Sequence, residues 1–331
     1  MKREVLISAI LAIGLLGVGA YGFFNARTLD YEAPSDQILP TKTPKAQESI
    51  LLFTGDIMLD RNVKKAVMDV GGGDWRFPFM RIAEYLRSAD LTMANLEGPV
   101  SSRGTRVGSI YSFRFDPAVL EGLQYAGFDI VTIANNHIWD YSQQAFLDTM
   151  KHLTDGGISF VGAGNNFDQV HQGVTKTIKD TRITFLGYTD LLSKQLAATP
   201  TTAGVGFLDM EQMKKDIQAA KAHSDLVVVN VHKGDEYHTS HNADQELYYH
   251  AAIDAGADLV VGHHPHVVEE LEHYKDGWIA YSLGNFIFDQ YFSEETMQGG
   301  ILRVTLADKK IKMVELVPVY ISPVSQAYLG Q

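Results

Sequence analysis

Side chains that commonly bind metal ions follow short apolar β-type runs at widely separated places in this chain. The runs span residues 51–54, 91–94, 130–133, 226–229 and 259–261. The side chains that follow them are Asp56, Glu97, Asn136, His232, His264 and His266. Loops at the ends of neighbouring strands lie at one edge of a sheet, so we expect these residues to converge in space.

Carboxylate, amide and imidazole groups together suit hard-to-borderline divalent cations. The pattern therefore predicts a site for one or two ions, with Mn, Fe, Zn or Mg as candidates. The first hypothesis for its chemistry is metal-assisted hydrolysis.

From residue 49 onward, short Val/Ile/Leu-rich runs alternate with helix-like segments. The predicted helices span residues 79–87, 117–126, 143–153, 210–223 and 244–255. This alternation predicts an α/β domain with largely parallel strand pairing. Residues 301–306 and 311–319 flank turn residues and predict a β-hairpin near the end. So many strands favour two packed sheets over one.

The N-terminal region has a different character. Residues 5–24 carry no charge and are long enough to cross the hydrocarbon core of a bilayer as a helix. Lys2 and Arg3 precede them, which favours a cytoplasmic N-terminus and an exported C-terminal part. We predict an anchor over residues 1–27, a Pro-containing linker over 28–48 and one domain over 49–331. The alternative is a signal peptide cleaved near Ala20, although the apolar run is longer than usual for one.

Composition narrows the classes of partner. There are 28 Lys and Arg against 40 Asp and Glu, a formal net charge of −12. That balance argues against general binding of nucleic acid, which requires a basic surface. The chain has no Cys, so neither a disulfide nor a lipid-modified cysteine is available to it.

Two motifs carry the most chemistry. In Asn135-Asn136-His137, the imidazole is a candidate proton donor that Asp140 would orient. In His264-Pro265-His266, we expect Pro265 to hold His264 extended, so that both imidazoles lie on one side of the backbone. His263 would then point the other way, and we leave it out of the predicted site.

Three further residues are candidates for contacts with substrate or for support of the ligands. Asn95 shares a face with Glu97 in an extended chain, Glu236 follows His232, and Asn285 lies in a strand-to-loop turn. Taken singly, each of these motifs also fits ordinary turn and helix-capping chemistry. The bland alternative, an α/β domain with polar loops, requires all of them to be coincidental.

Taken in series, the motifs resemble the bacterial CapA/PgsA capsule-synthesis family over residues 49–320. The segments that carry the resemblance are Gly55-Asp56-Ile57-Met58, Asn95-Leu96-Glu97, Asn135-Asn136-His137, His232-Lys233-Gly234-Asp235-Glu236-Tyr237, Gly262-His263-His264-Pro265-His266 and Ser282-Leu283-Gly284-Asn285-Phe286. That family is similar to the calcineurin-like metallophosphoesterases, which implies a four-layer α-β-β-α sandwich with a two-metal site at the strand ends.

The resemblance also implies roles and a setting. Asp56 and His266 would hold one metal, Asn136, His232 and His264 the other, and Glu97 would replace the usual bridging Asp. His137 would act near the leaving group. The setting would be a single-pass, extracytoplasmic protein of the cell membrane. It would work beside capsule synthase or export proteins, on a phosphoester or an anionic polymer such as poly-γ-glutamate.

One departure from the phosphoesterase pattern bears on activity. The position two residues after the first Asp is usually His, but here it is Met58. A thioether is a poor ligand for hard divalent metals. The alternative function is therefore a non-catalytic assembly or polymer-binding subunit of a capsule synthase or export complex.

Overall fold

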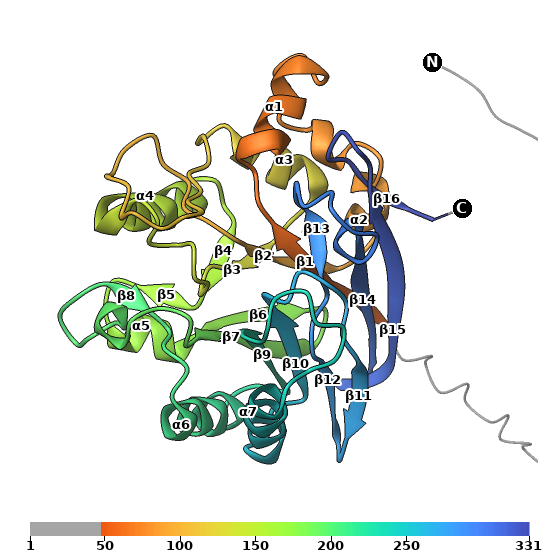
Figure 1. The fold of residues 1–331 in the computed structure, drawn as a ribbon. Helices are drawn as coiled ribbons and strands as arrows, with labels where there is room; N and C mark the ends of the chain where they lie inside the picture. Colours follow the sequence, from red (N-terminus) through yellow and green to blue (C-terminus); the bar gives the residue numbers. More distant parts are fainter. Residues whose placement is uncertain (1–47, 331) are drawn as a thin grey trace, which may run out of the picture. The chain divides into compact units, whose positions relative to one another are not determined.

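Two β-sheets packed face to face form the centre of residues 48–330, the part of the chain that this computed structural model describes (Figure 1). The predicted anchor over residues 1–27 and all but the last residue of the predicted linker lie outside the described residues. Within the described range, no helix combines the length and apolarity needed to cross a membrane.

The first sheet has the order β16-β15-β14-β1-β2-β3-β4, and β13 pairs with β1 beside this path. Strands β1 to β4 run parallel to one another, and β14 to β16 extend the sheet in antiparallel fashion. The strands are β1 (Ser49–Ile57), β2 (Leu91–Leu96), β3 (Ile130–Thr132), β4 (Ser159–Val161), β13 (Asn285–Ile287), β14 (Gln298–Ala307), β15 (Lys310–Ile321) and β16 (Ala327–Leu329).

The second sheet has the order β11-β12-β10-β9-β7-β6. Its inner strands are parallel, and β6 and β11 pair with their neighbours in antiparallel fashion at the two edges. The strands are β6 (Val174–Ile178), β7 (Thr181–Thr189), β9 (Leu226–His232), β10 (Leu259–His263), β11 (Leu271–Tyr274) and β12 (Gly277–Ala280). A two-stranded sheet pairs β5 (Ala163–Gly164) with β8 (Gly204–Val205).

Helices cover the outer face of each sheet. The α-helices are α1 (Arg61–Asp69), α2 (Ala83–Arg87), α3 (Val119–Ala126), α4 (Ser142–Asp155), α5 (Phe167–Gln172), α6 (Met210–Lys221) and α7 (Ala243–Asp254). Three short 3₁₀ helices span Phe77–Phe79, Lys194–Leu196 and Glu295–Met297. Helices α1 to α4 flank the first sheet, and α6 and α7 flank the second (Figure 1).

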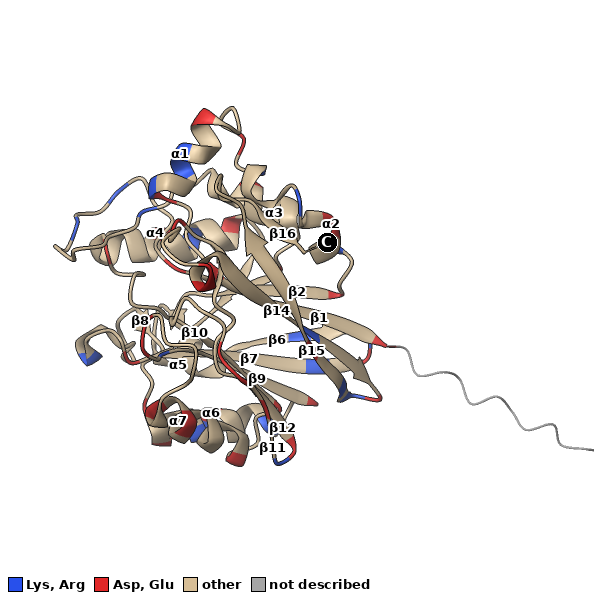
Figure 2. Ribbon diagram, turned by 45° about the vertical axis from the view of Figure 1, so that its right-hand side comes forward, with Lys and Arg blue, Asp and Glu red and all other residues tan. Residues whose placement is uncertain are grey.

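Three buried clusters hold these layers together. Leu123 and Phe146 join helices to the first sheet, Phe53 and Val261 meet between the two sheets, and Tyr249 joins α7 to the second sheet. Charged residues lie mainly on the outer helices, loops and strand ends (Figure 2). The predicted α/β class, the two packed sheets and the C-terminal hairpin are confirmed, but helix α1 has no counterpart in the prediction.

Close backbone contact fixes the end of β1 at the site. The amide of Asp56 donates to the carbonyl of Gly284 over 2.9 Å, and a Cβ on Gly55 would lie 1.9 Å from that same carbonyl oxygen. We therefore expect Gly55→Ala to lower the free energy of unfolding by about 1–3 kcal/mol, the usual cost of overpacking. Denaturant unfolding measures it. Gly156→Ala is the control, because its nearest contact would be 3.2 Å, and an equal loss in both variants would contradict the explanation.

Candidate metal centre

The predicted ligand residues come together where strands of the two sheets end. Asp56 lies near the end of β1, Glu97 follows β2, and His232 ends β9. His264 and His266 lie in the loop after β10, and Asn136 follows β3. All of these side chains are buried except Asn136, which is partly exposed.

The carboxylate of Asp56 is surrounded by nitrogen atoms. It accepts from the Asn95 amide over 2.8 Å and from the backbone N–H of His264 over 3.2 Å. Nδ1 of His263 lies 3.3 Å away and Nδ1 of His266 3.4 Å away. Burial alone would raise the pKa of Asp56, but the two imidazoles outweigh it and hold that pKa well below its ordinary value. Asp56 is therefore ionised.

Glu97 has a buried oxygen without a protein partner. No described residue forms a hydrogen bond with its Oε1, although Nε2 of His266 lies 3.7 Å away and Nε2 of His137 3.8 Å away. Burial raises the pKa of Glu97 well above its ordinary value, against the opposing effect of His266. A buried, unpartnered carboxylate oxygen facing two imidazole nitrogens at these separations fits a cation between them.

His232 and His264 form the neutral side of the cluster, with ring centroids 4.9 Å apart. Nε2 of His232 pairs with the Asn136 oxygen over 2.9 Å, and its Nδ1 lies 3.2 Å from the Asn95 amide nitrogen. Burial lowers the pKa of His264 to about 3, and burial together with His264 lowers that of His232. Neutral imidazole is the form that binds a metal ion.

His266 lies between the carboxylates and a supporting amide. Its Nδ1 pairs with the Asn285 oxygen over 3.0 Å, which leaves Nε2 facing Glu97. Burial would lower its pKa, but Glu97 and Asp56 outweigh burial and raise it to about 9. An amide that fixes the far nitrogen of a histidine is the usual support for a metal ligand, and a metal ion at Nε2 would take the place of the proton that this raised pKa implies.

Asn95 occupies the middle of the cluster. Its amide nitrogen lies 2.8 Å from Asp56, 3.3 Å from Glu97 and 3.2 Å from His232, and its oxygen accepts from Asn135 over 3.1 Å. The Asn135 contact fixes which way the amide points. The two N–H bonds of the Asn95 amide are therefore shared among two carboxylates and an imidazole.

The pair of His137 and Asp140 adjoins this cluster. Asp140 accepts from Nδ1 of His137 over 2.7 Å and from the backbone N–H of Phe113 over 2.8 Å. The Phe113 ring also lies 4.1 Å, between centroids, from the His137 ring. These contacts leave Nε2 of His137 directed toward Glu97, at the edge of an open pocket.

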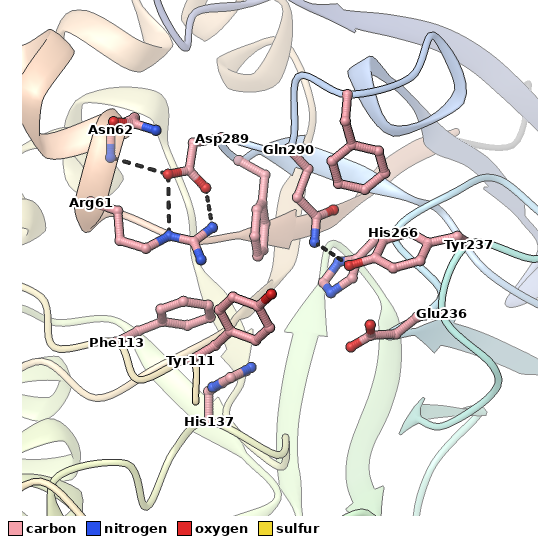
Figure 3. Close-up of a pocket in the computed structure, with 12 residues that line it drawn as sticks. Arg61, Asn62, Tyr111, Phe113, His137, Glu236, Tyr237, His266, Asp289 and Gln290 are labelled. Carbon is pink, nitrogen blue, oxygen red and sulfur yellow. Dashed lines mark hydrogen bonds and ion pairs between the residues drawn. The ribbon is translucent and has the colours of Figure 1, made fainter. Parts of the chain in front are cut away.

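The pocket beside the cluster has a volume of about 480 Å³ and is shown in Figure 3. His137, His266 and the exposed Glu236 line it together with Arg61, Phe113 and Phe288. Ligand atoms of Glu236, His264 and His266 lie within 4.8 Å of one another, and so do those of Asp56, Glu97 and His266. The described residues thus offer two overlapping groups that could hold a metal ion, and His266 is common to both.

Comparison with known proteins identifies the family. Residues 50–290, more than half of the chain, match the family described as bacterial capsule synthesis protein PGA_cap. The chain belongs to this family. The capsule biosynthesis protein CapA of Bacillus anthracis is 32% identical over 295 residues, covering 87% of this chain and 71% of that protein. The PGA biosynthesis protein CapA of Bacillus subtilis is 33% identical over 332 residues, covering 98% and 84%.

A solved structure has a similar fold. A crystal structure described as a novel phosphatase from Mycoplasma pneumoniae aligns with a TM-score of 0.51 at 15% identity, covering 83% of this chain and 94% of that one. At this identity the similarity concerns the fold alone. The PGA_cap chain therefore shares the arrangement of its sheets with this solved structure.

The loop after β10 of this PGA_cap protein, which carries His264 and His266, differs from its predicted conformation. His264 has a φ of 100° and His266 a φ of 60°, so the backbone is not extended there as the Pro265 argument required. The rings nevertheless lie 5.9 Å apart. His263, which the alternation argument left out, is buried beside Asp56, and neither of its ring nitrogens forms a hydrogen bond with a described residue. Strand alternation could not indicate this, because β10 ends at that residue.

Met58 packs in the hydrophobic core of the PGA_cap domain. It is fully buried in the cluster between the first sheet and its helices, and its sulfur accepts from the Asp60 amide over 3.1 Å. Met58, the residue that departs from the phosphoesterase pattern, is thus a core side chain.

A buried acid follows the histidine loop and makes stability depend on pH. Glu269 is 5% exposed, its Oε2 accepts from Gln245 over 2.7 Å, and its Oε1 has no partner among the described residues. Burial raises its pKa from the ordinary value of 4.5 to about 8. Between these two values the folded protein binds the extra proton, so its stability falls as pH rises.

We expect Glu269→Gln to remove this fall, because the amide resembles the protonated acid and does not titrate. Urea unfolding at pH 5 and pH 8 measures the effect, which is at most about 1.4 kcal/mol per pH unit. The exposed neighbour Glu270 provides the control Glu270→Gln. A wild-type loss of stability from pH 5 to 8 that persists unchanged in Glu269→Gln would contradict this assignment.

Proposed function

We propose that this capsule-family protein is a metal-dependent hydrolase. The observation that carries the proposal is the buried, unpartnered Oε1 of Glu97, which faces the imidazoles of His266 and His137. Ionised Asp56 and neutral His264 lie around the same point. A purely structural polar cluster would satisfy its buried atoms internally.

The proposed ligands form two adjoining sets. Asp56, Glu97 and His266 would hold one ion, and His264 with Glu236 a second, because Nε2, the nitrogen of His266 that Asn285 leaves free, can bind only one ion. His232 and Asn136 would complete the second set. Nε2 of His232 and the amide oxygen of Asn136 now form a hydrogen bond with each other, and this bond would have to break before either atom could bind the ion. The mixture of oxygen and imidazole nitrogen fits Mn, Fe, Zn or Mg. When bound, a divalent cation would polarise a substrate oxygen and lower the pKa of water.

The chain's own residues would position the substrate and move a proton. Asp140 accepts from Nδ1 of His137 and so fixes the tautomer and the ring orientation. With a second proton on Nε2, His137 would keep its Nδ1–H on Asp140 and pass the Nε2 proton to the leaving oxygen or nitrogen of a substrate in the pocket. The substrates that fit this role are a phosphoester and a γ-glutamyl amide.

Metal content and turnover together test the proposal. We expect the purified full chain to hold one or two divalent ions per molecule and to hydrolyse an aryl phosphoester or a γ-glutamyl anilide. We expect chelation to stop the reaction and one of Mn, Fe, Zn or Mg to restore it. A protein that folds but retains none of these ions would overturn the proposal.

The buried Met58 favours a second candidate, a non-catalytic assembly or polymer-binding subunit. It occupies the place of a phosphoesterase ligand and contributes only packing and a contact with Asp60. This candidate predicts bound metal without turnover of either substrate class. Hydrolysis that is lost in a His137 variant would exclude it.

The setting of the reaction is a further part of the proposal. Residues 5–24 would anchor the chain in the cell membrane, with the α/β domain on the extracytoplasmic side beside capsule synthase or export proteins. The uncharged run over residues 5–24 supports the anchor, and the relatives named for capsule and PGA biosynthesis support the connection with capsule synthesis. Protease treatment of intact cells should digest the domain and leave a cytoplasmic control protein whole; protection of the domain would place it inside.

A further inference from the structure

We propose that Arg61 and the aromatic rings around it bind a single anionic group of the substrate, a carboxylate or a phosphate whose organic part lies against the rings. This inference rests on the proposed function, because it assigns the substrate class of the same pocket. Arg61 lies within the family match but is not among the candidate ligands, and the match assigns it no role. It begins helix α1, one of the helices that the sequence pattern did not predict.

Arg61 is held from one side only. Its Nε donates to Asp289 over 3.1 Å, its Nη2 also pairs with Asp289, and the backbone N–H of Asn62 donates to the same carboxylate over 3.1 Å. The Asp289 side chain is 2% exposed, so it is a fixed acceptor. Nη1 of Arg61 has no partner among the described residues, and in Figure 3 it carries no dashed line. A rigid guanidinium with one free N–H edge suits an oxyanion.

Aromatic rings surround this guanidinium. The guanidinium carbon Cζ lies 4.8 Å from the Phe113 ring centroid, 5.9 Å from that of Phe288 and 6.0 Å from that of Tyr111. These contacts hold the cation in place and provide apolar walls beside it. Arg61 has a φ of 49°, a conformation that costs energy in a residue other than glycine, so its position is maintained by these partners.

The same rings connect Arg61 to the site. Phe113 lies 4.1 Å from the ring of His137, and Phe288 lies 4.7 Å from the ring of His266. One aromatic ring therefore separates the guanidinium from the proposed proton donor, and another separates it from a proposed ligand. A substrate held at Arg61 would lie along these rings with its reacting end between the two histidines.

Size and charge determine the class of ligand. A volume of about 480 Å³ suits a small molecule or one chain end. Among the described lining residues Arg61 is the only Lys or Arg, and Glu236 and Asp289 are acidic. Glu236 and Asp289 would repel a ligand that carries many carboxylates. The only Lys or Arg in the described lining, Arg61, already pairs with Asp289. One anionic group on a largely apolar stem fits, such as a phosphomonoester or the terminal residue of a polymer.

Calorimetric binding to the chelator-treated full chain tests the inference independently of metal and turnover. Phenyl phosphate and N-benzoylglycine, each with one anionic group, are the two anionic probes, and benzyl alcohol is the neutral probe. We expect at least one anion to bind and Arg61→Gln to weaken it by about 10-fold or more, the worth of a charge-assisted hydrogen bond. The affinity of each anion tells a phosphate group from a carboxylate.

The matched control is Arg76→Gln. Arg76 also pairs with an acid, Asp74, beside a ring, that of Tyr125, but it lies outside this pocket. Equal affinity in wild type and Arg61→Gln, or equal binding of the neutral probe, would overturn the inference. If Arg61→Gln does not fold, Arg61→Lys decides: lysine keeps the charge but loses the planar fork of N–H donors, so anion binding should weaken at least 3-fold, and unchanged binding would overturn the inference.

The two proposals fail in different ways. Absence of metal and turnover, with anion binding that still depends on Arg61, would refute the hydrolase and leave a binding site. Turnover with no effect of Arg61→Gln on anion affinity would leave the hydrolase proposal standing and refute the role of Arg61 in binding the anion.

Discussion

Replacing His264 with alanine is expected to reduce metal affinity by more than about 100-fold and to abolish hydrolysis. Changing a group that merely supports a ligand typically costs 10–100-fold in metal affinity, and loss of a ligand should exceed that. The buried Nδ1 of His264 has no hydrogen-bond partner among the described residues, so the substitution breaks no side-chain contact of that atom. Elemental analysis and turnover on the same preparation measure both effects.

The control for this variant is His238→Ala. His238 is exposed and lies outside both groups of candidate ligands. It should keep the metal and the activity of the wild type. If His264→Ala retains its metal and hydrolyses substrate normally, then His264 is not a ligand and the proposed second ion position is wrong.

Replacing His137 with glutamine is expected to lower kcat by about 10²–10⁴-fold, the usual contribution of a general acid. Metal content should remain at the wild-type level, because no group of candidate ligands includes His137. Glutamine can still donate to Asp140, so the fold around Phe113 should persist. Steady-state kinetics with an activated and a poor leaving group measure the change.

Leaving-group dependence identifies the role of His137 in this experiment. A proton donor matters most when the leaving group is basic, so the loss should be smaller for a nitrophenyl substrate than for an alkyl one. An equal loss for both, or a loss of metal along with activity, would show that His137 does something other than donate the proton. Asp140→Asn should show the same pattern with a smaller loss.

The convergence of the site could be predicted because it follows from topology. Asp56, Glu97, His232 and His264 lie near the ends of strands β1, β2, β9 and β10, and β1 runs parallel to β2 as β9 does to β10. A pattern of buried runs, each followed by a polar residue, is visible in sequence without knowledge of the fold. The order of the strands does not need to be known for their ends to share an edge.

Contacts that depend on loop conformation could not be predicted. Positive φ values at His264 and His266 turn that loop in a way that period-two alternation does not describe. His263 therefore reached Asp56 although the alternation argument excluded it. To predict this contact of His263, one would need to know the conformation of the loop that follows β10.

Contacts between residues far apart in the chain could not be predicted from the sequence either. Arg61 and Asp289 are 228 positions apart in the chain, and neither belongs to a motif. The aromatic walls of the pocket come from loops, whose positions are set by packing and not by local propensity. Met58 illustrates the same limit, because its departure from the phosphoesterase pattern is visible in sequence but its burial in the core is not.

The most direct test of the cation site is X-ray diffraction of a crystal of this protein soaked in Mn²⁺, measured at a wavelength that gives anomalous signal from manganese. The account predicts an anomalous peak within about 2.0–2.6 Å of ligand atoms from Asp56, Glu97 and His266. Well-ordered density for those side chains with no anomalous peak among them would contradict it.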